Sequence, residues 1–103
     1  MEKLSDHVRE MGERFMSSLA ALHLPLVAEI RGRGLLIGVE LAEAIGPFVE
    51  QAARDAGFII NAARPNVLRI APPLIISGEQ IDQAVAAFPG ILDAAFHAAA
   101  AQS

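Results

Sequence analysis

The sequence predicts an α+β fold, a two-layer sandwich in which a small, mostly antiparallel sheet carries helices on one face. Three observations predict it. Segments with apolar residues at steps of three and four lie near both ends and in the middle of the chain. Short apolar runs typical of strands lie in pairs between them, and glycine- or proline-containing turns separate the strands of each pair. The order is α-β-β-α-β-β-α, in one domain of 103 residues, and the sheet face without helices is solvated or covered by a missing partner.

The composition argues against several classes of function. The net charge is −4 and the basic residues form no stripe, so we expect no nucleic-acid partner. Cysteine is absent and the N-terminus does not resemble a signal peptide, so we expect a cytoplasmic protein. No apolar run approaches the length of a membrane span, so we expect no membrane partner. Apolar residues make up 53% before the eight glycines are counted, where about 45–50% including glycine is usual, and this excess suggests a face that meets another surface.

Residues 3–22 have the pattern of an amphipathic helix. Glu10 and Arg14 have the i, i+4 spacing of an ion pair on its polar side. Gly12 weakens the middle of the segment, and Pro25 ends it. The apolar stripe consists of Leu4, Val8, Met11, Phe15, Leu19 and Leu22.

Two strands are expected next, at residues 26–31 and 34–41, joined by a glycine-rich turn. The second is almost continuously apolar, as in a strand that is buried on both faces. Gly32, Gly34 and Gly38 are spaced one residue too widely for the dinucleotide-binding fingerprint, and a strand follows them where that fingerprint needs a helix. A nucleotide-binding loop is therefore excluded.

Residues 44–56 are expected to form the second helix. Pro47 suits its first turn, Glu50 and Arg54 have ion-pair spacing, and Gly57 is the expected stop. Its buried side is expected to consist of Ile45, Phe48, Val49, Ala52 and Ala56.

A third helix is expected to begin after Ser77, whose side chain forms a capping box with Gln80. Pro89 and Gly90 are expected to kink or split it, and residues 97–103 are expected to fray. Its buried stripe is expected to consist of Ile81, Val85, Phe88, Leu92 and Phe96.

The candidate binding residue is Arg69. Residues 58–61 and 67–71 are expected to pair as strands around a polar turn at 63–66. Alternation places Arg69 on the face opposite Leu68 and Ile70, which anchor the strand in the core. The two prolines at 72 and 73 end the ladder, so Arg69 lies near the end of a sheet strand. Its planar, always charged guanidinium can bind a carboxylate with two parallel hydrogen bonds, although an ordinary solvated arginine fits the same pattern.

We find no catalytic or metal-binding motif in the sequence. His7 and His23 have no partner at the spacing of metal ligands, and the carboxylates are scattered. The single lysine, Lys3, lies at the start of the first helix. The chain alone is therefore not expected to be catalytically active.

Three segments together resemble the C-terminal small domain of class III, pyridoxal-phosphate (PLP)-dependent aminotransferases of fold type I. They are RGRGLLIGVEL, DAGFIINAARPNVLRIAPPL and SGEQIDQAVAAFPGIL, and the resemblance covers residues 3–93. Their order and spacing are most similar to the acetylornithine aminotransferase subfamily, although the ornithine, succinylornithine and 4-aminobutyrate aminotransferases share much of the pattern.

The resemblance implies that the chain belongs to a longer enzyme of arginine biosynthesis, which transfers an amino group from N-acetylornithine or a related ω-amine to 2-oxoglutarate. Arg69 is then the residue that binds the substrate's carboxylate. The family's PLP site lies in the large domain of the same chain, which is missing here, and the parent is expected to be a homodimer. Asn61, Asn66, Gly32 and Gly34 match family positions and are expected to serve turns and domain contacts.

Two other classes of function stay open. One is a free-standing amino-acid-binding regulatory α/β module, which predicts a stable dimer that binds an amino acid without PLP. The other is a structural or interaction domain in which Arg69 is an ordinary partner in an interfacial ion pair.

Overall fold

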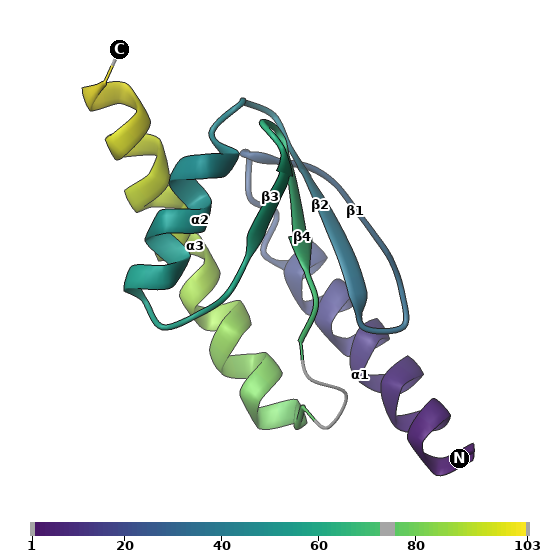
Figure 1. Ribbon diagram of the computed structural model, residues 1–103. Coiled ribbons are helices and arrows are strands. Elements are labelled where there is room, and N and C mark those ends of the chain that lie inside the picture. Colours follow the sequence, from purple (N-terminus) through teal and green to yellow (C-terminus); the bar gives the residue numbers. More distant parts are fainter. Residues whose placement is uncertain (1, 73–75, 103) are drawn as a thin grey trace.

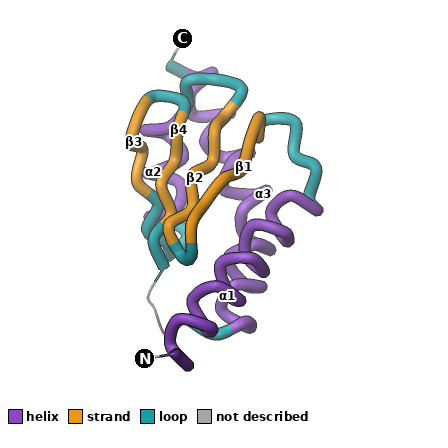
Figure 2. Tube along the Cα trace, turned by 90° about the vertical axis from the view of Figure 1, so that its right-hand side faces the viewer, coloured by secondary structure: helices purple, strands orange, loops and turns teal. Residues whose placement is uncertain are grey.

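The computed structural model describes residues 2–72 and 76–102 (Figure 1). Four antiparallel strands form one sheet in the order β1-β2-β4-β3, and the helices lie against one side of it (Figures 1 and 2). This arrangement confirms the predicted fold class and element order. The elements are α1 (Glu2–Ala21), β1 (Val27–Arg33), β2 (Leu36–Leu41), α2 (Gly46–Asp55), β3 (Asn61–Arg64), β4 (Val67–Ile70) and α3 (Gly78–Ala101).

The core lies between the helices and one face of the sheet. Ile37 and Val39 in β2 are fully buried, whereas Leu36 in the same strand is 54% exposed. The expectation that this strand is buried on both faces is therefore wrong, because the helices cover one face only. The largest fully buried side chains are Ile37, Val39, Val49, Leu68 and Ile81.

Helix α1 packs through the predicted stripe. Met11, Phe15 and Leu19 are buried, and Val8 and Leu22 pack against the same core at partial burial. The side chain of Leu4 lies outside the described residues.

The polar side of α1 differs from the expected one. Arg14 does not pair with Glu10; its Nη2 donates to Oδ2 of Asp82 on α3 at 2.6 Å. The tertiary arrangement thus places a carboxylate of another helix within reach of Arg14, which no spacing within α1 could predict.

Glycines bring α1 and the β1–β2 hairpin together. Gly34 adopts φ +59° in the turn, as expected for this glycine-rich segment. A side chain at Gly12 would overlap the carbonyl oxygen of Gly34. Gly12 therefore does more than weaken α1, because it allows the close approach of the helix to the hairpin.

Helix α2 follows the predicted limits closely. Pro47 lies in its first turn, Gly57 has φ +90° just after its end, and Glu50 pairs with Arg54 at 3.4 Å. Ala56 is exposed, contrary to expectation, and Ala53 occupies the buried position because it continues the helical face begun at Val49.

The strand β3 begins three residues later than expected. Residues 58–60 form a loop instead of a strand, and the expected turn at 63–66 shortens to a turn between Arg64 and Val67. The backbone N–H of Phe58 bonds to the carbonyl of Ala53, which holds this segment against the end of α2. Ile60 in this loop is buried, whereas Ile59 is 86% exposed.

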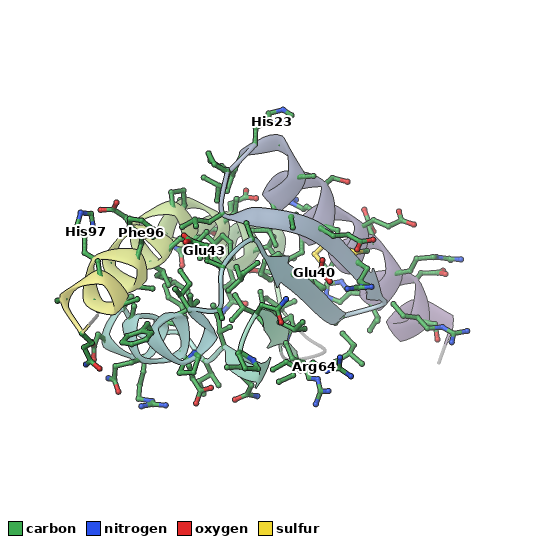
Figure 3. All side chains as sticks on the ribbon, turned by 90° about the horizontal axis from the view of Figure 1, so that it is seen from above. His23, Glu40, Glu43, Arg64, Phe96 and His97 are labelled. Atoms are coloured by element: carbon green, nitrogen blue, oxygen red, sulfur yellow. The ribbon has the colours of Figure 1, made fainter. Side chains whose placement is uncertain are left out.

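Helix α3 is continuous from Gly78 to Ala101 with Pro89 inside it, so of the two expected effects, a kink or a split near Phe88, the split is wrong. The capping box of Ser77 and Gln80 is confirmed by hydrogen bonds of 3.1 Å and 3.0 Å. Residues 97–101, where we expected fraying, are helical. Phe96 is 43% exposed near the outer end of the helix (Figure 3), and Ile91 and Ala95 are buried in its place.

By length and composition alone, α3 is apolar enough to cross a membrane, so the expectation that no apolar run reaches this length is wrong. One such helix is weak evidence, because helices of a folded core pass the same test. Here α3 buries Ile81, Val85, Phe88 and Leu92 against the rest of the domain.

Candidate functional site on the exposed sheet face

Arg69 lies in β4, a central strand of the sheet. Its direct neighbours are Gly38 in β2 and Asn61 in β3. Arg69 is exposed, whereas Leu68 and Ile70 on either side of it are buried on the opposite face. The predicted alternation is thus confirmed, and the strand ends at Ile70, shortly before Pro72. Pro73, the second proline of the expected stop, lies outside the described residues.

The sheet face that carries Arg69, called the open face below, is rich in arginine. Residues directly opposite each other on neighbouring antiparallel strands point to the same side, so the strand register defines this face. Arginine supplies four of its charged residues and glutamate two, an excess of positive charge in a chain whose net charge is −4. This face is therefore suited to attract a carboxylate. Its charged members are Glu29, Arg31, Arg33, Glu40, Arg64 and Arg69.

The ion pairs of the open face are unevenly distributed. Nη2 of Arg31 lies 2.9 Å from Oε1 of Glu40, and its Nη1 lies 3.7 Å from Oε2 of Glu29. Figure 3 shows Glu40 and Arg64 on the strands. Within the described part of the chain, Arg33, Arg64 and Arg69 form no ion pair. The guanidinium of Arg69 is therefore available to an incoming anion.

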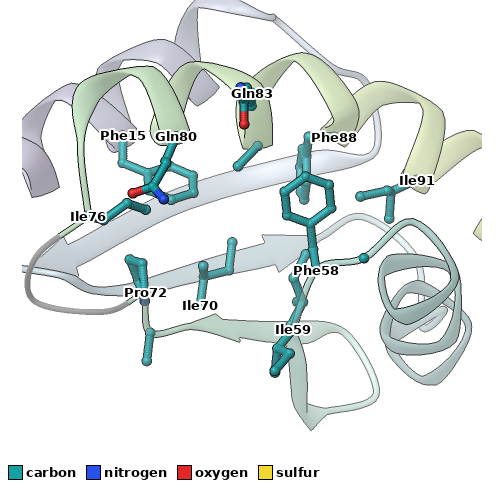
Figure 4. A pocket seen from close by; sticks show the side chains of 14 residues that line it. Phe15, Phe58, Ile59, Ile70, Pro72, Ile76, Gln80, Gln83, Phe88 and Ile91 are labelled. Carbon is teal, nitrogen blue, oxygen red and sulfur yellow. The ribbon is translucent and has the colours of Figure 1, made fainter.

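A cavity of about 590 Å³ lies on the helix side of the sheet, between α3 and the segment at residues 57–60 (Figure 4). Its lining is mainly apolar and includes Phe58, Ile70 and Phe88, with the amide side chains of Gln80 and Gln83. Ile70 lines it and Arg69 does not, so the cavity and the arginine lie on opposite faces of β4. This cavity was not predicted from the sequence, in which residues 58–60 were expected to belong to a strand.

The four family-matched residues occupy distinct places. Gly34 lies in the hairpin turn, and a side chain at Gly32 would lie 2.9 Å from Sδ of Met16. The carbonyl of Asn66 accepts a hydrogen bond of 2.7 Å from the N–H of Leu41, which joins the β3–β4 turn to the end of β2. Asn61 is the one of the four that lies beside Arg69, on the open face.

Other polar side chains have local partners. Nε2 of His7 lies 2.8 Å from the carbonyl oxygen of Ile76, and Glu50 accepts a hydrogen bond of 2.8 Å from the N–H of Ala62. Among the residues that the structure describes, no group of three or more His, Cys, Asp or Glu side chains could hold a metal ion.

Comparison with known proteins gives consistent results. The model of the family described as aminotransferase class-III matches residues 1–92. An acetylornithine aminotransferase of Mycobacterium leprae is 49% identical over 84 residues, which cover 82% of this chain and 21% of that protein. An ornithine aminotransferase of Bacillus subtilis is 46% identical over 84 residues, with 82% and 21% covered. The chain thus spans about a fifth of the length of these relatives.

The fold also matches a solved structure of a transaminase. An omega transaminase from Pseudomonas jessenii in complex with PMP superposes with a TM-score of 0.81 and 30% sequence identity. The match covers 93% of this chain and 24% of that protein.

Proposed function

Because the chain belongs to the class III aminotransferase family, we propose that it is the substrate-carboxylate-binding domain of a longer PLP-dependent aminotransferase. One observation carries the proposal. Arg69 is exposed at the centre of an arginine-rich sheet face and has no ion-pair partner among the described residues. A planar guanidinium in this setting matches a carboxylate, which accepts two parallel hydrogen bonds from it.

Arg69 contributes by positioning and not by bond making. Strands β2 and β3 pair with β4 on both sides and fix the backbone at Arg69. A substrate that is bound through its carboxylate has its amino group held at a defined distance from this anchor, which lowers the entropic cost of reaction. Charge complementarity adds selectivity for carboxylate-bearing amines over simple amines.

The proposed amino donor is N-acetylornithine or a related ω-amine such as ornithine, and the acceptor is 2-oxoglutarate. The similarity to an acetylornithine aminotransferase supports the first donor, and that to an ornithine aminotransferase supports the wider class. The place of the reaction in arginine biosynthesis, the homodimeric parent and its cytoplasmic location belong to the same proposal.

The residues of this chain do not fit the cofactor. PLP enzymes hold the coenzyme through a lysine, and the one lysine here, Lys3, lies in the first turn of α1. We therefore assign the cofactor site to a large domain of the parent chain, with this chain as the C-terminal small domain. PLP supplies an electron sink there when bound. The present chain alone is expected to have no transaminase activity.

Replacing Arg69 in the full-length enzyme tests the proposal. Arg69→Ala removes a charged hydrogen-bond partner, so we expect KM for the carboxylate-bearing donor to rise and kcat/KM to fall about ten- to a hundredfold. Steady-state kinetics with N-acetylornithine and with ornithine measure both parameters.

The matched control is Arg33→Ala, which removes the same charge from the open face at the edge strand β1. We expect kcat/KM of this variant to stay within about twofold of the wild-type value. An unchanged kcat/KM in Arg69→Ala would remove the carboxylate-binding role.

A further inference from the structure

The two carboxylates of the open face share one arginine. Glu29 and Glu40 lie directly opposite each other on β1 and β2, a position at which like charges repel. Arg31 contacts both, at 2.9 Å to Oε1 of Glu40 and at 3.7 Å to Oε2 of Glu29. The repulsion is thus neutralised by Arg31, and both carboxylates are held at the β1 side of the sheet.

Glu40 also lies within diagonal reach of Arg69. The pairs Gly38–Arg69 and Glu40–Val67 are adjacent in the β2–β4 ladder, so Glu40 and Arg69 are diagonal neighbours on the open face. Diagonal Cβ atoms in an antiparallel pair are about 7–8 Å apart, which long side chains can bridge. Gly38 places no side chain between Arg31 and Arg69.

In the structure this diagonal contact is not formed. Arg69 has no ion pair among the described residues, and Glu40, its diagonal neighbour, is engaged by Arg31. A free Glu40 would face Glu29 on one side and the unpaired Arg69 on the other. Electrostatics would then move it toward Arg69.

We propose that Arg31 is a positioning residue that keeps Glu40 away from Arg69 and so keeps the carboxylate site open. The inference rests on the proposed function, since it assumes that Arg69 binds the substrate's carboxylate. It assigns a role to an arginine that does not itself contact the substrate.

The expected size of the effect follows from the exposure of these groups. The side chains of Arg31 and Glu40 are 56% and 37% exposed, so an ion pair here is weak. A comparable pair of Glu40 with Arg69 would form with an equilibrium constant of about two to five. Because only the unpaired fraction of Arg69 binds substrate, KM would rise about three- to sixfold.

The test uses the full-length enzyme that contains this chain. We expect Arg31→Gln to raise KM for N-acetylornithine about three- to sixfold with kcat unchanged, and this increase to shrink at high salt. The double variant Arg31→Gln/Glu40→Gln is expected to restore KM, because it removes the competing carboxylate. Arg31→Lys keeps a cation beside Glu40 and is expected to stay near the wild-type KM.

Three controls separate positioning from a structural effect. Arg33→Gln removes a charge of the same face and is expected to leave KM within about twofold of wild type. An amine substrate without a carboxylate is expected to show the same KM with wild type and Arg31→Gln. Thermal unfolding of each variant checks that the domain remains folded.

The outcomes distinguish the two proposals. If Arg69→Gln leaves KM for N-acetylornithine unchanged, the carboxylate-binding function itself fails. If Arg69→Gln raises KM but Arg31→Gln behaves like Arg33→Gln, or if the double variant does not recover, only the role of Arg31 is overturned.

Discussion

Gly12 determines how closely α1 approaches the β1–β2 hairpin. Any side chain at this position would overlap the carbonyl oxygen of Gly34, which belongs to the backbone and cannot swing aside. Gly34 itself adopts a φ of +59°, which residues with a side chain rarely take up. The contact therefore requires glycine on both sides.

At this scale we predict that Gly12→Ala destabilises the chain. Overpacking against backbone costs more than the helix propensity of alanine returns, so the free energy of unfolding should fall by about 2 kcal/mol. Urea denaturation measures it. Gly90→Ala in α3 is the control, since a side chain there meets nothing within 4 Å, and it should raise stability by about 0.5–1 kcal/mol. Equal stabilisation by both substitutions would contradict this account.

Single residues were predictable where their environment is local. The exposure of Arg69 follows from strand alternation and the Glu50–Arg54 pair from helical spacing. The partner of Arg14 was not predictable, because Asp82 is 68 residues away and reaches it only through the packing of α3 against α1. The contact of Arg31 with Glu40 on the neighbouring strand was likewise not predicted.

Elements were predictable where a capping or turn signal marks their ends. Ser77 precedes the start of α3 and Gly57 follows the end of α2, as the sequence indicates. The segment at residues 58–60 was misassigned, since a short apolar run does not by itself distinguish a strand from an irregular segment. Pro89 does not split α3, which runs through it without a break.

For the element α3 we predict that its N-terminal cap contributes measurably to stability. Ser77→Ala removes the acceptor of the N–H of Gln80, so the free energy of unfolding should fall by about 1 kcal/mol. Ser17→Ala, at an exposed position inside α1, is the control and should not lower stability. Chemical denaturation measures the free energy of unfolding of both variants. Equal free energies of unfolding in Ser77→Ala and Ser17→Ala would show that the capping box is not a stabilising feature.

The sheet has one apolar face, which packs against the helices, and one charged face, the open face. The chain is acidic overall, yet its exposed sheet face has an excess of arginine. The antiparallel topology places segments about forty residues apart in sequence, β1 and β4, on this one face. Such a juxtaposition follows from the fold, and the sequence pattern alone indicated only Arg69.

At the molecular scale we predict the size of the parent protein. The chain spans 21% of the length of the acetylornithine aminotransferase of Mycobacterium leprae, so the polypeptide isolated from its source after borohydride reduction should be several times heavier than 10.9 kDa. It should carry a phosphopyridoxyl-lysine outside these 103 residues. Intact-mass and peptide mass spectrometry test both points. A free 10.9 kDa chain without cofactor would favour the regulatory amino-acid-binding module.

The central place of β4 in the sheet has a consequence for evolution and engineering. The ladders of β4 with β2 and with the edge strand β3 hold the backbone of Arg69, so its position does not depend on β1 at the other edge of the sheet. The edge strand β1, which does not pair with β4, can therefore diverge, and with it the preferred substrate, while Arg69 stays in register. Libraries that aim at new amine donors should vary β1 and its turns and leave β4 and its two partner strands unchanged.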